Sequence, residues 1–454
     1  MCFLMLIRSL HTLMLCAVFA MVAAPAEKLA ATPPMGWNSW DAYGLTINEE
    51  QFRANAQVLA GLKSYGWNYA VVDEGWYFAD PQARPEARKS AWDTNGRLIP
   101  DAARYPSAAN GAGFKPLADW THSQGLKFGI HIVRGIPKGV VGENLAVANS
   151  GFHASDVADT GDTCPWDNGN YGVRDNPAGQ AYYDSMMRLY ANWGLDFLKV
   201  DCIADHPYKG AEIRMIATAI EKAGRPIVLS LSPGPTNLSH AAEVAEYSQM
   251  WRIADDIWDG WDFHAGQFPS GIVSAFDNLA KWAKFAKPGN WPDADMLPWG
   301  SLTPHPGWGP PRQSRITGDE QRTQFALWAI SRSPLILGAN LTKLDDFTRS
   351  LITNKEVIAI DQTAVSSAEI AGDPADSARM RVWSAATGGP RPTRYVAVFN
   401  LQESALQRDV AWPSSLAGSA HAVYEIWSRR NVPSATVLHV ELPAHGCALF
   451  RIER

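Results

Sequence analysis

The chain has no concentrated positive charge and no Gly-rich phosphate-binding loop. Its 40 Lys and Arg residues are outnumbered by 46 Asp and Glu residues, which gives a formal net charge of −6. Without a basic block, nucleic acid and anionic membranes are poor candidates for partners. The missing phosphate loop argues against a nucleotide-binding fold.

Long apolar runs are absent after the N-terminus. Arg8 precedes an apolar stretch over residues 13–24, which ends in Ala24-Pro25-Ala26. This pattern is typical of a secretory signal peptide, here residues 1–26. Cys16 would suit a lipoprotein, but Leu15 stands where a small residue should precede the cysteine. The sequence predicts export to the periplasm or the medium, with no membrane association after cleavage.

Cysteine is scarce, with five residues in the whole chain. Cys2 and Cys16 leave with the predicted signal peptide, so an oxidising compartment permits one disulfide and one leftover thiol. Cys202 directly follows an acidic strand end, and Cys164 lies in a Gly/Asp/Asn-rich loop that can fold over the same rim. Unpaired buried cysteines are the alternative, and the role of Cys447 stays open.

Tryptophan, in contrast, is abundant, with 19 residues. Its flat apolar faces stack on the C–H groups of sugars, although burial in a large core accounts for most of them. A hydrophobic fraction of 46% with 19% charged residues is typical of a soluble globular protein. The length of 454 residues suits a large barrel with a second domain.

Strand-like and helix-like segments alternate over residues 27–357, which favours a parallel sheet. The strand-like segments are residues 34–40, 69–73, 127–132, 197–201, 226–230, 247–252, 290–295 and 334–338. Eight such units predict a (β/α)8 TIM barrel rather than an open sheet. From residue 358 to 454 the helical segments stop and short strand-like runs follow one another, which predicts a C-terminal antiparallel β-sandwich with a structural role.

Polar side chains gather at the ends of the predicted strands. The candidates are Asp73, Glu74, His131, Lys199, Asp201, Arg252, Asp256, Asp295 and Asn340. A lone acid at such a position is usually a helix cap or a loop hydrogen bonder. In a barrel, however, the carboxyl ends of the strands converge on one site. A calcium site is the other alternative, but no Asp-rich loop has the ligand spacing for it.

Facing carboxylates without metal ligands suit glycoside hydrolysis, which needs one ionised and one protonated acid. Lys199 lies two residues before Asp201 on the same face of the strand, so its charge is expected to keep Asp201 ionised. Arg252 precedes a second acid, Asp256, by four residues. Three apolar neighbours are expected to raise the pKa of Asp256, namely Trp251, Ile257 and Trp258.

From residue 33 to the C-terminus the chain resembles glycoside hydrolase family 27, the retaining α-galactosidase (melibiase) family. The segments that carry the resemblance occur in the family's order. They are Pro34-Met35-Gly36-Trp37-Asn38-Ser39-Trp40, Val72-Asp73-Glu74-Gly75-Trp76, Phe197-Leu198-Lys199-Val200-Asp201, Trp251-Arg252 through Asp256-Ile257, Asp293-Ala294-Asp295-Met296-Leu297 and Leu327-Trp328-Ala329-Ile330.

The resemblance implies a role for each matching residue. Asp201 falls on the nucleophile and Asp256 on the general acid/base, with Asp256 preferred to Asp255 because of its spacing from Arg252. The other substrate-binding positions are Trp40 as the stacking platform, Asp73 for the polar hydroxyls, Lys199 beside the nucleophile, Arg252 for the 2-hydroxyl, and Asp295. The family's rim disulfide falls on Cys164 and Cys202, and its barrel is followed by a C-terminal β-sandwich.

Three positions depart from the family pattern. Glu74 replaces the second Asp of an Asp-Asp pair, and its extra methylene could crowd the C6 hydroxymethyl group, which would favour β-L-arabinopyranose over galactose. The alternative is that Glu74 bends away and makes the same hydrogen bonds. Ser232 stands where many relatives have an acid, which keeps α-N-acetylgalactosaminidase activity open. His131 replaces a tyrosine. It is expected either to hydrogen-bond the substrate or the nucleophile, or to be a core histidine whose hydrogen bonds are satisfied within the protein.

The sequence thus predicts an exported, retaining exo-glycosidase for terminal α-D-galactosyl units, with β-L-arabinopyranosyl units as the alternative. Neither a metal nor an organic cofactor is expected. An inactive carbohydrate-binding protein is the non-enzyme alternative, and a metal-dependent barrel hydrolase is disfavoured because His ligands are not clustered. The natural glycan, its linkage and the oligomeric state, including a homo-oligomer, stay open.

Overall fold

The computed structural model describes residues 28–263, 268–303, 310–370, 374–412, 422–433 and 437–453. The predicted signal peptide, residues 1–26, lies outside these ranges. None of the helices within them is both long and apolar enough to cross a bilayer.

The central element is an eight-stranded sheet in the order β10-β9-β8-β7-β3-β2-β1-β13, with every neighbouring pair parallel. Its strands are β1 (Met35–Asn38), β2 (Tyr69–Val72), β3 (Lys127–Val133), β7 (Phe197–Asp201), β8 (Val228–Leu231), β9 (Met250–Arg252), β10 (Trp291–Asp293) and β13 (Leu335–Leu337). The sheet curls so that its two edges approach each other. Leu297, just after β10, forms a parallel bridge to Leu337 and closes the barrel. The predicted (β/α)8 barrel is confirmed.

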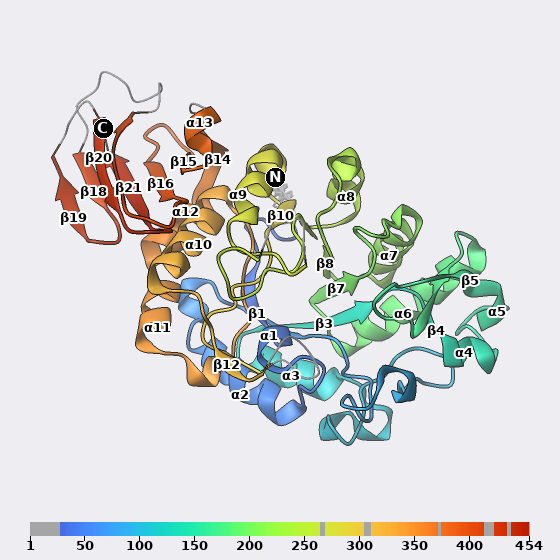
Figure 1. Cartoon of the computed structure of the whole chain (residues 1–454). Helices are drawn as coiled ribbons and strands as arrows, with labels where there is room; N and C mark the ends of the chain where they lie inside the picture. The colour runs from blue at the N-terminus through green and yellow to red at the C-terminus, as the bar shows by residue number, and fades with distance from the viewer. Residues whose placement is uncertain are drawn as a thin grey trace, which may run out of the picture.

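Helices cover the outside of the barrel (Figure 1). They include α2 (Glu49–Ala60), α3 (Lys115–Ser123), α6 (Pro177–Trp193), α7 (Gly210–Ala223), α8 (Ala241–Tyr247), α9 (Ser274–Trp282) and α10 (Gly318–Ser331). Local sequence fixes where several of them begin. Asn48 and Gln51 form a capping box at α2, and Thr317 and Glu320 form another at α10.

A small sheet lies over the rim after β3, in a region that the sequence predicts to be a long loop. It consists of β4 (Ile136–Pro137), β6 (Asn170–Val173) and β5 (Ala158–Thr163), in that order and antiparallel. The sequence of β5 is ADTGDT, in which apolar and polar residues do not alternate, so this strand could not be predicted from the sequence.

The C-terminal domain is antiparallel. A six-stranded sheet has the order β14-β15-β16-β21-β18-β19, and β17 and β20 pair separately. The strands are β14 (Ala364–Glu369), β15 (Met380–Thr387), β16 (Arg394–Asn400), β17 (Leu406–Ala411), β18 (Ala422–Glu425), β19 (Arg430–Val432), β20 (Val437–Leu442) and β21 (Cys447–Glu453). A second core that includes Val396, Leu406, Val440 and Phe450 fills the space between the two sheets. The prediction of a β-sandwich is confirmed, and the boundary expected at residues 357/358 falls inside α12 (Lys355–Thr363).

Helix α10 belongs to both domains. Eleven of its 14 residues are buried, because one side faces the barrel and the other faces the C-terminal sheet (Figure 1). Thr323 Oγ1 donates to the carbonyl of His445, 2.6 Å away, and the His445 ring stacks on Trp261 with centroids 4.1 Å apart. The two domains are therefore joined by a buried interface rather than by a linker.

Candidate active site

Asp201 ends β7 at the carboxyl rim of the barrel. The Cys202 N–H donates to Asp201 Oδ1 at 2.7 Å, and His131 Nε2 on the neighbouring strand lies 3.7 Å from Oδ2. Burial alone would raise the pKa of Asp201, but the His131 imidazole, the Lys199 ammonium and the Cys202 N–H together lower it. This carboxylate is therefore held in its ionised form.

Lys199 contacts a different carboxylate from the one the sequence predicts. Its Nζ lies 3.0 Å from Asp73 Oδ2, which also accepts a 2.6 Å hydrogen bond from Asn38 Nδ2. Although burial opposes it, the charges of His131 and Lys199 hold the pKa of Asp73 well below its usual range. The ammonium still lowers the pKa of Asp201, so the expected effect is present as one part of a network, not as a direct ion pair.

Arg252, Asp256 and Asp295 form the other side of the site. Arg252 Nη2 lies 2.9 Å from Asp295 Oδ2 and 3.2 Å from Asp256 Oδ1. The Ile257 N–H donates to Asp295 Oδ2 at 2.6 Å. Burial, opposed by Arg252 and reinforced by the charges of Asp256 and Asp293, raises the pKa of Asp295 to about 7. Asp295 therefore loses its proton only near neutral pH.

Asp256 is not enclosed by the apolar neighbours that the sequence suggests. Its side chain is 33% exposed and contacts the Arg252 guanidinium, whereas Trp251, Ile257 and Trp258 are buried in the core. Although burial opposes it, the charges of Asp73, Asp201 and Asp256 raise the pKa of Lys199, so Asp201 and Asp256 both lie within electrostatic range of one ammonium group.

Glu74 follows Asp73 and meets a partner from the rim. Burial and the charges of Asp167, Asp201 and Asp73 raise its pKa well above the usual range, and its side chain shares a hydrogen bond with Asp167. The pKa of Glu74 is therefore raised, whereas the pKa of Asp73 beside it is lowered. The two residues are not equivalent acids.

The remaining candidates lie on the same rim with different degrees of burial. Trp40 begins α1 (Trp40–Tyr43) and is half-buried, and its backbone N–H donates to Asn38 Oδ1. His131 is 1% exposed, and its Nδ1 has no hydrogen-bond partner, so it is not a satisfied core histidine. Ser232 is buried, and its carbonyl accepts from the Ile203 N–H at 3.1 Å, which ties β8 to the segment after Asp201. Asn340 caps the short turn at Leu341–Lys343.

Sequence reasoning missed Asp41, a buried carboxyl beside the site. Burial and the charges of Asp295, Asp256 and Asp73, opposed by Lys199, raise its pKa well above the usual range. Its Oδ2 has no hydrogen-bond partner, and it lies so close to Gly338 that a Cβ there would be only 1.7 Å away. The available signal was its position directly after the matching segment that ends at Trp40.

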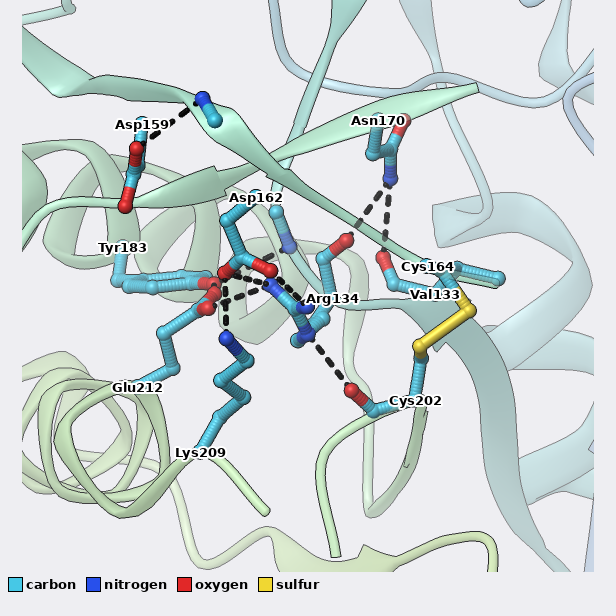
Figure 2. Close-up of polar contacts among 12 residues, drawn as sticks. Val133, Arg134, Asp159, Asp162, Cys164, Asn170, Tyr183, Cys202, Lys209 and Glu212 are labelled. Atoms are coloured by element: carbon cyan, nitrogen blue, oxygen red, sulfur yellow. Dashed lines mark hydrogen bonds and ion pairs between the residues drawn. A yellow bond between two sulfur atoms is a disulfide. The ribbon is translucent and has the colours of Figure 1, made fainter. Parts of the chain in front are cut away.

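A second missed feature is Arg134, which follows β3 and holds the segment after Asp201 (Figure 2). Its N–H donates to the Asp201 carbonyl at 3.1 Å, and its Nε donates to the Cys202 carbonyl at 2.6 Å. The guanidinium also pairs with Asp162 at 2.9 Å and with Glu212 at 2.8 Å. Cys202 has a left-handed φ of 60° and forms the disulfide with Cys164. Arg134 and the disulfide thus fix from two sides the residue whose N–H orients Asp201.

We expect Arg134→Met to destabilise the fold by about 3–5 kcal/mol, because it leaves the 2%-exposed Glu212 without its counter-charge. Thermal and urea unfolding would measure the loss. Arg97→Met is the matched control, because it breaks a partly exposed pair with Asp93 and should cost about 1 kcal/mol or less. The double variant Arg134→Met/Glu212→Leu should recover part of the stability. Equal losses for the two arginine variants would contradict this account.

Several acids at the carboxyl end of a parallel barrel, with the pKa of Asp201 lowered and that of Asp295 raised, are typical of a barrel glycoside hydrolase. Family models agree on both domains: the α-galactosidase A model matches residues 32–142 and 137–363, and the α-galactosidase C-terminal β-sandwich model matches residues 377–452. The chain belongs to the α-galactosidase family, glycoside hydrolase family 27.

Individual relatives within the family differ in what they act on. The chain is 29% identical to α-galactosidase A of Cellvibrio japonicus, with 96% of each chain covered, and 28% identical to an α-galactosidase of Cyamopsis tetragonoloba, with 93% and 86% covered. Among solved structures, it is 40% identical to a family 27 β-L-arabinopyranosidase of Geobacillus stearothermophilus. That match has a TM-score of 0.87 and covers 94% of this chain and 97% of the other.

Proposed function

We propose that the protein is a retaining exo-glycosidase that removes terminal α-D-galactosyl units. The observation that carries the proposal is the difference in charge state across the site. Asp201 is held ionised, whereas the pKa of Asp295, which shares the Arg252 guanidinium with Asp256, is raised by burial to about 7. A double displacement needs this asymmetry before the substrate enters.

In the first step Asp201 Oδ2 attacks the anomeric carbon, since Oδ1 is occupied by the Cys202 N–H. The bond from that carbon to the leaving oxygen breaks, and Asp256 transfers a proton to this oxygen. In the second step Asp256 accepts a proton from water, and the water oxygen displaces Asp201 from the anomeric carbon. Two inversions leave the released sugar with its original configuration.

The surrounding residues hold the sugar. The Asp73 carboxylate, fixed by Asn38 and Lys199, accepts hydrogen bonds from hydroxyls, and Arg252 donates to the 2-hydroxyl. Trp40 offers its partly exposed face to the apolar side of the ring. The buried Asp295 holds Arg252 at 2.9 Å and so orients this donor.

β-L-Arabinopyranosides are the second candidate substrate, and Glu74 is the observation that favours them. Glu74 is one methylene longer than Asp and is held by Asp167, which narrows the space for a C6 hydroxymethyl group. The likeness to a β-L-arabinopyranosidase at 40% identity supports the same interpretation. β-L-Arabinopyranose has the galactose configuration but lacks this group.

The test is the ratio of kcat/KM for an aryl α-galactoside and an aryl β-L-arabinopyranoside, before and after Glu74→Asp. We expect the shorter side chain to shift the ratio about 10-fold toward the galactoside, because one methylene is worth about 1–3 kcal/mol in a fitted pocket. Glu86→Asp, in the exposed Pro85–Ala87 turn, is the control and should change nothing. An unchanged ratio in Glu74→Asp would show that Glu74 does not select the sugar.

The proposal as a whole is tested by assaying the wild type on both substrates with EDTA present and following the released sugar by NMR. Hydrolysis with retention supports it. Inversion, inhibition by chelator or the absence of turnover contradicts it, and the last result would favour a carbohydrate-binding protein. An aryl α-N-acetylgalactosaminide belongs in the panel because Ser232 is small.

We infer that the protein works after export. The signal peptide predicted over residues 1–26 and the Cys164–Cys202 disulfide both point to an oxidising compartment. Fractionation of cells that express the full chain, with N-terminal sequencing of the product, would test this inference.

A further inference from the structure

Trp166 is the only tryptophan of the described ranges that is largely exposed, at 45%. A single exposed hydrophobic residue on a surface is ordinary and needs no explanation. What distinguishes Trp166 is its location, because the short segment that carries it is tied to the active site on both sides.

One tie is covalent, since Cys164 is bonded to Cys202, the neighbour of Asp201. The other is the hydrogen bond that Asp167 shares with Glu74. Trp166 therefore stands at the mouth of the site, between a link to the nucleophile and a link to the residue beside Asp73.

The Trp166 ring extends toward the other side of the mouth. Its centroid lies 5.3 Å from that of His206, whose side chain is 50% exposed. His206 Nε2 in turn lies 3.9 Å from Asp255 Oδ1, and Asp255 immediately precedes Asp256. Trp166 and His206 thus form an aromatic pair that reaches from the nucleophile side of the rim to the acid/base side.

We propose that this aromatic pair is a leaving-group subsite that binds a neutral sugar. The inference rests on the proposed function, because the leaving oxygen departs toward Asp256 and the sugar attached to it must pass Asp255 and His206. The indole takes the apolar C–H face of that sugar. Asp205 Oδ2 lies 2.8 Å from His206 Nδ1, and Asp255 Oδ1 lies 3.9 Å from His206 Nε2. These carboxylates accept hydrogen bonds from the hydroxyls of the sugar, and their charge repels a uronic acid or a phosphorylated sugar.

Two substrates with the same glycosyl unit separate this subsite from the catalytic pocket. The trisaccharide raffinose presents a sugar as leaving group, whereas α-galactosyl fluoride presents an atom too small to stack on a ring. If the wild type prefers arabinopyranosides, an arabinopyranosyl disaccharide and the matching fluoride replace them. We expect Trp166→Ala to lower kcat/KM at least 10-fold for the oligosaccharide and less than twofold for the fluoride.

Two further variants sharpen the test. Trp166→Tyr keeps an aromatic face and should retain most of the oligosaccharide activity. Val365→Ala removes another exposed apolar side chain, on β14 of the C-terminal domain, and should alter neither substrate. Equal effects of Trp166→Ala on both substrates, or no effect on either, would overturn the subsite and leave the proposed function intact. A wild type that cleaves neither substrate would overturn the proposed function itself.

Discussion

Asp201→Asn should reduce kcat at least about 10⁴-fold, equivalent to about 5.5 kcal/mol of transition-state stabilisation. The amide is nearly isosteric, so the Cys202 N–H can still donate to its oxygen and the fold should persist. What disappears is the negative charge that attacks the anomeric carbon. Initial rates on an aryl glycoside, together with the melting temperature of the same sample, would measure both effects.

Controls separate loss of the nucleophile from general damage. Asp159→Asn changes an exposed carboxylate on β5 of the rim sheet and should leave kcat unaltered. Asp201→Ala supplemented with azide should regain activity, because the anion fits the vacated space, and should yield a glycosyl azide of inverted configuration. Asp201→Asn with near wild-type turnover would remove Asp201 from the mechanism.

Asp256→Ala should lower kcat/KM about 10³-fold for a disaccharide, whose alkoxide cannot leave without a proton. For a glycosyl fluoride the same variant should lose less than about 10-fold, because fluoride needs little assistance from an acid. kcat/KM is the appropriate quantity, since it reports the first, bond-breaking step. The dependence on the leaving group is what a merely structural residue would not produce.

Asp255→Ala provides the comparison for Asp256. Its carboxylate is similarly exposed, at 32%, but lies toward His206 and away from the Arg252 contact. It should not show a 10³-fold preference for the fluoride. If Asp255→Ala shows this pattern and Asp256→Ala does not, the two acids have been assigned in the wrong order.

The barrel and the positions of its polar residues could be predicted because both depend on patterns within short segments of the sequence. Apolar runs such as residues 197–201 end in a charge, and topology alone brings the carboxyl ends of parallel strands together. Asp73, Asp201, Arg252 and Asp295 could therefore be placed on one rim without knowing any contact.

The pairing of those residues could not be predicted, because it depends on side-chain direction. Lys199 shares a strand face with Asp201, yet its long side chain reaches Asp73, which directly follows β2, two strands away in the sheet. Arg134 sits in a segment without regular periodicity, and its partners Asp162 and Glu212 are 28 and 78 residues distant. Asp41 could not be recognised from the sequence, because its raised pKa comes from burial against distant segments such as the one that carries Gly338.

Helix α10 has a consequence for how this enzyme could be shortened or recombined. Deleting the chain after residue 363 would remove the C-terminal sheet from one side of α10, whose other side packs on the catalytic barrel. Side chains of α10 that are buried in the intact protein would then be exposed to solvent. Neither the barrel nor the C-terminal domain can therefore be exchanged independently of the other. A foreign β domain fused to this barrel would need a surface complementary to α10. Because α10 packs on both domains, thermal unfolding that begins in the C-terminal sheets would also destabilise the barrel that carries the active site.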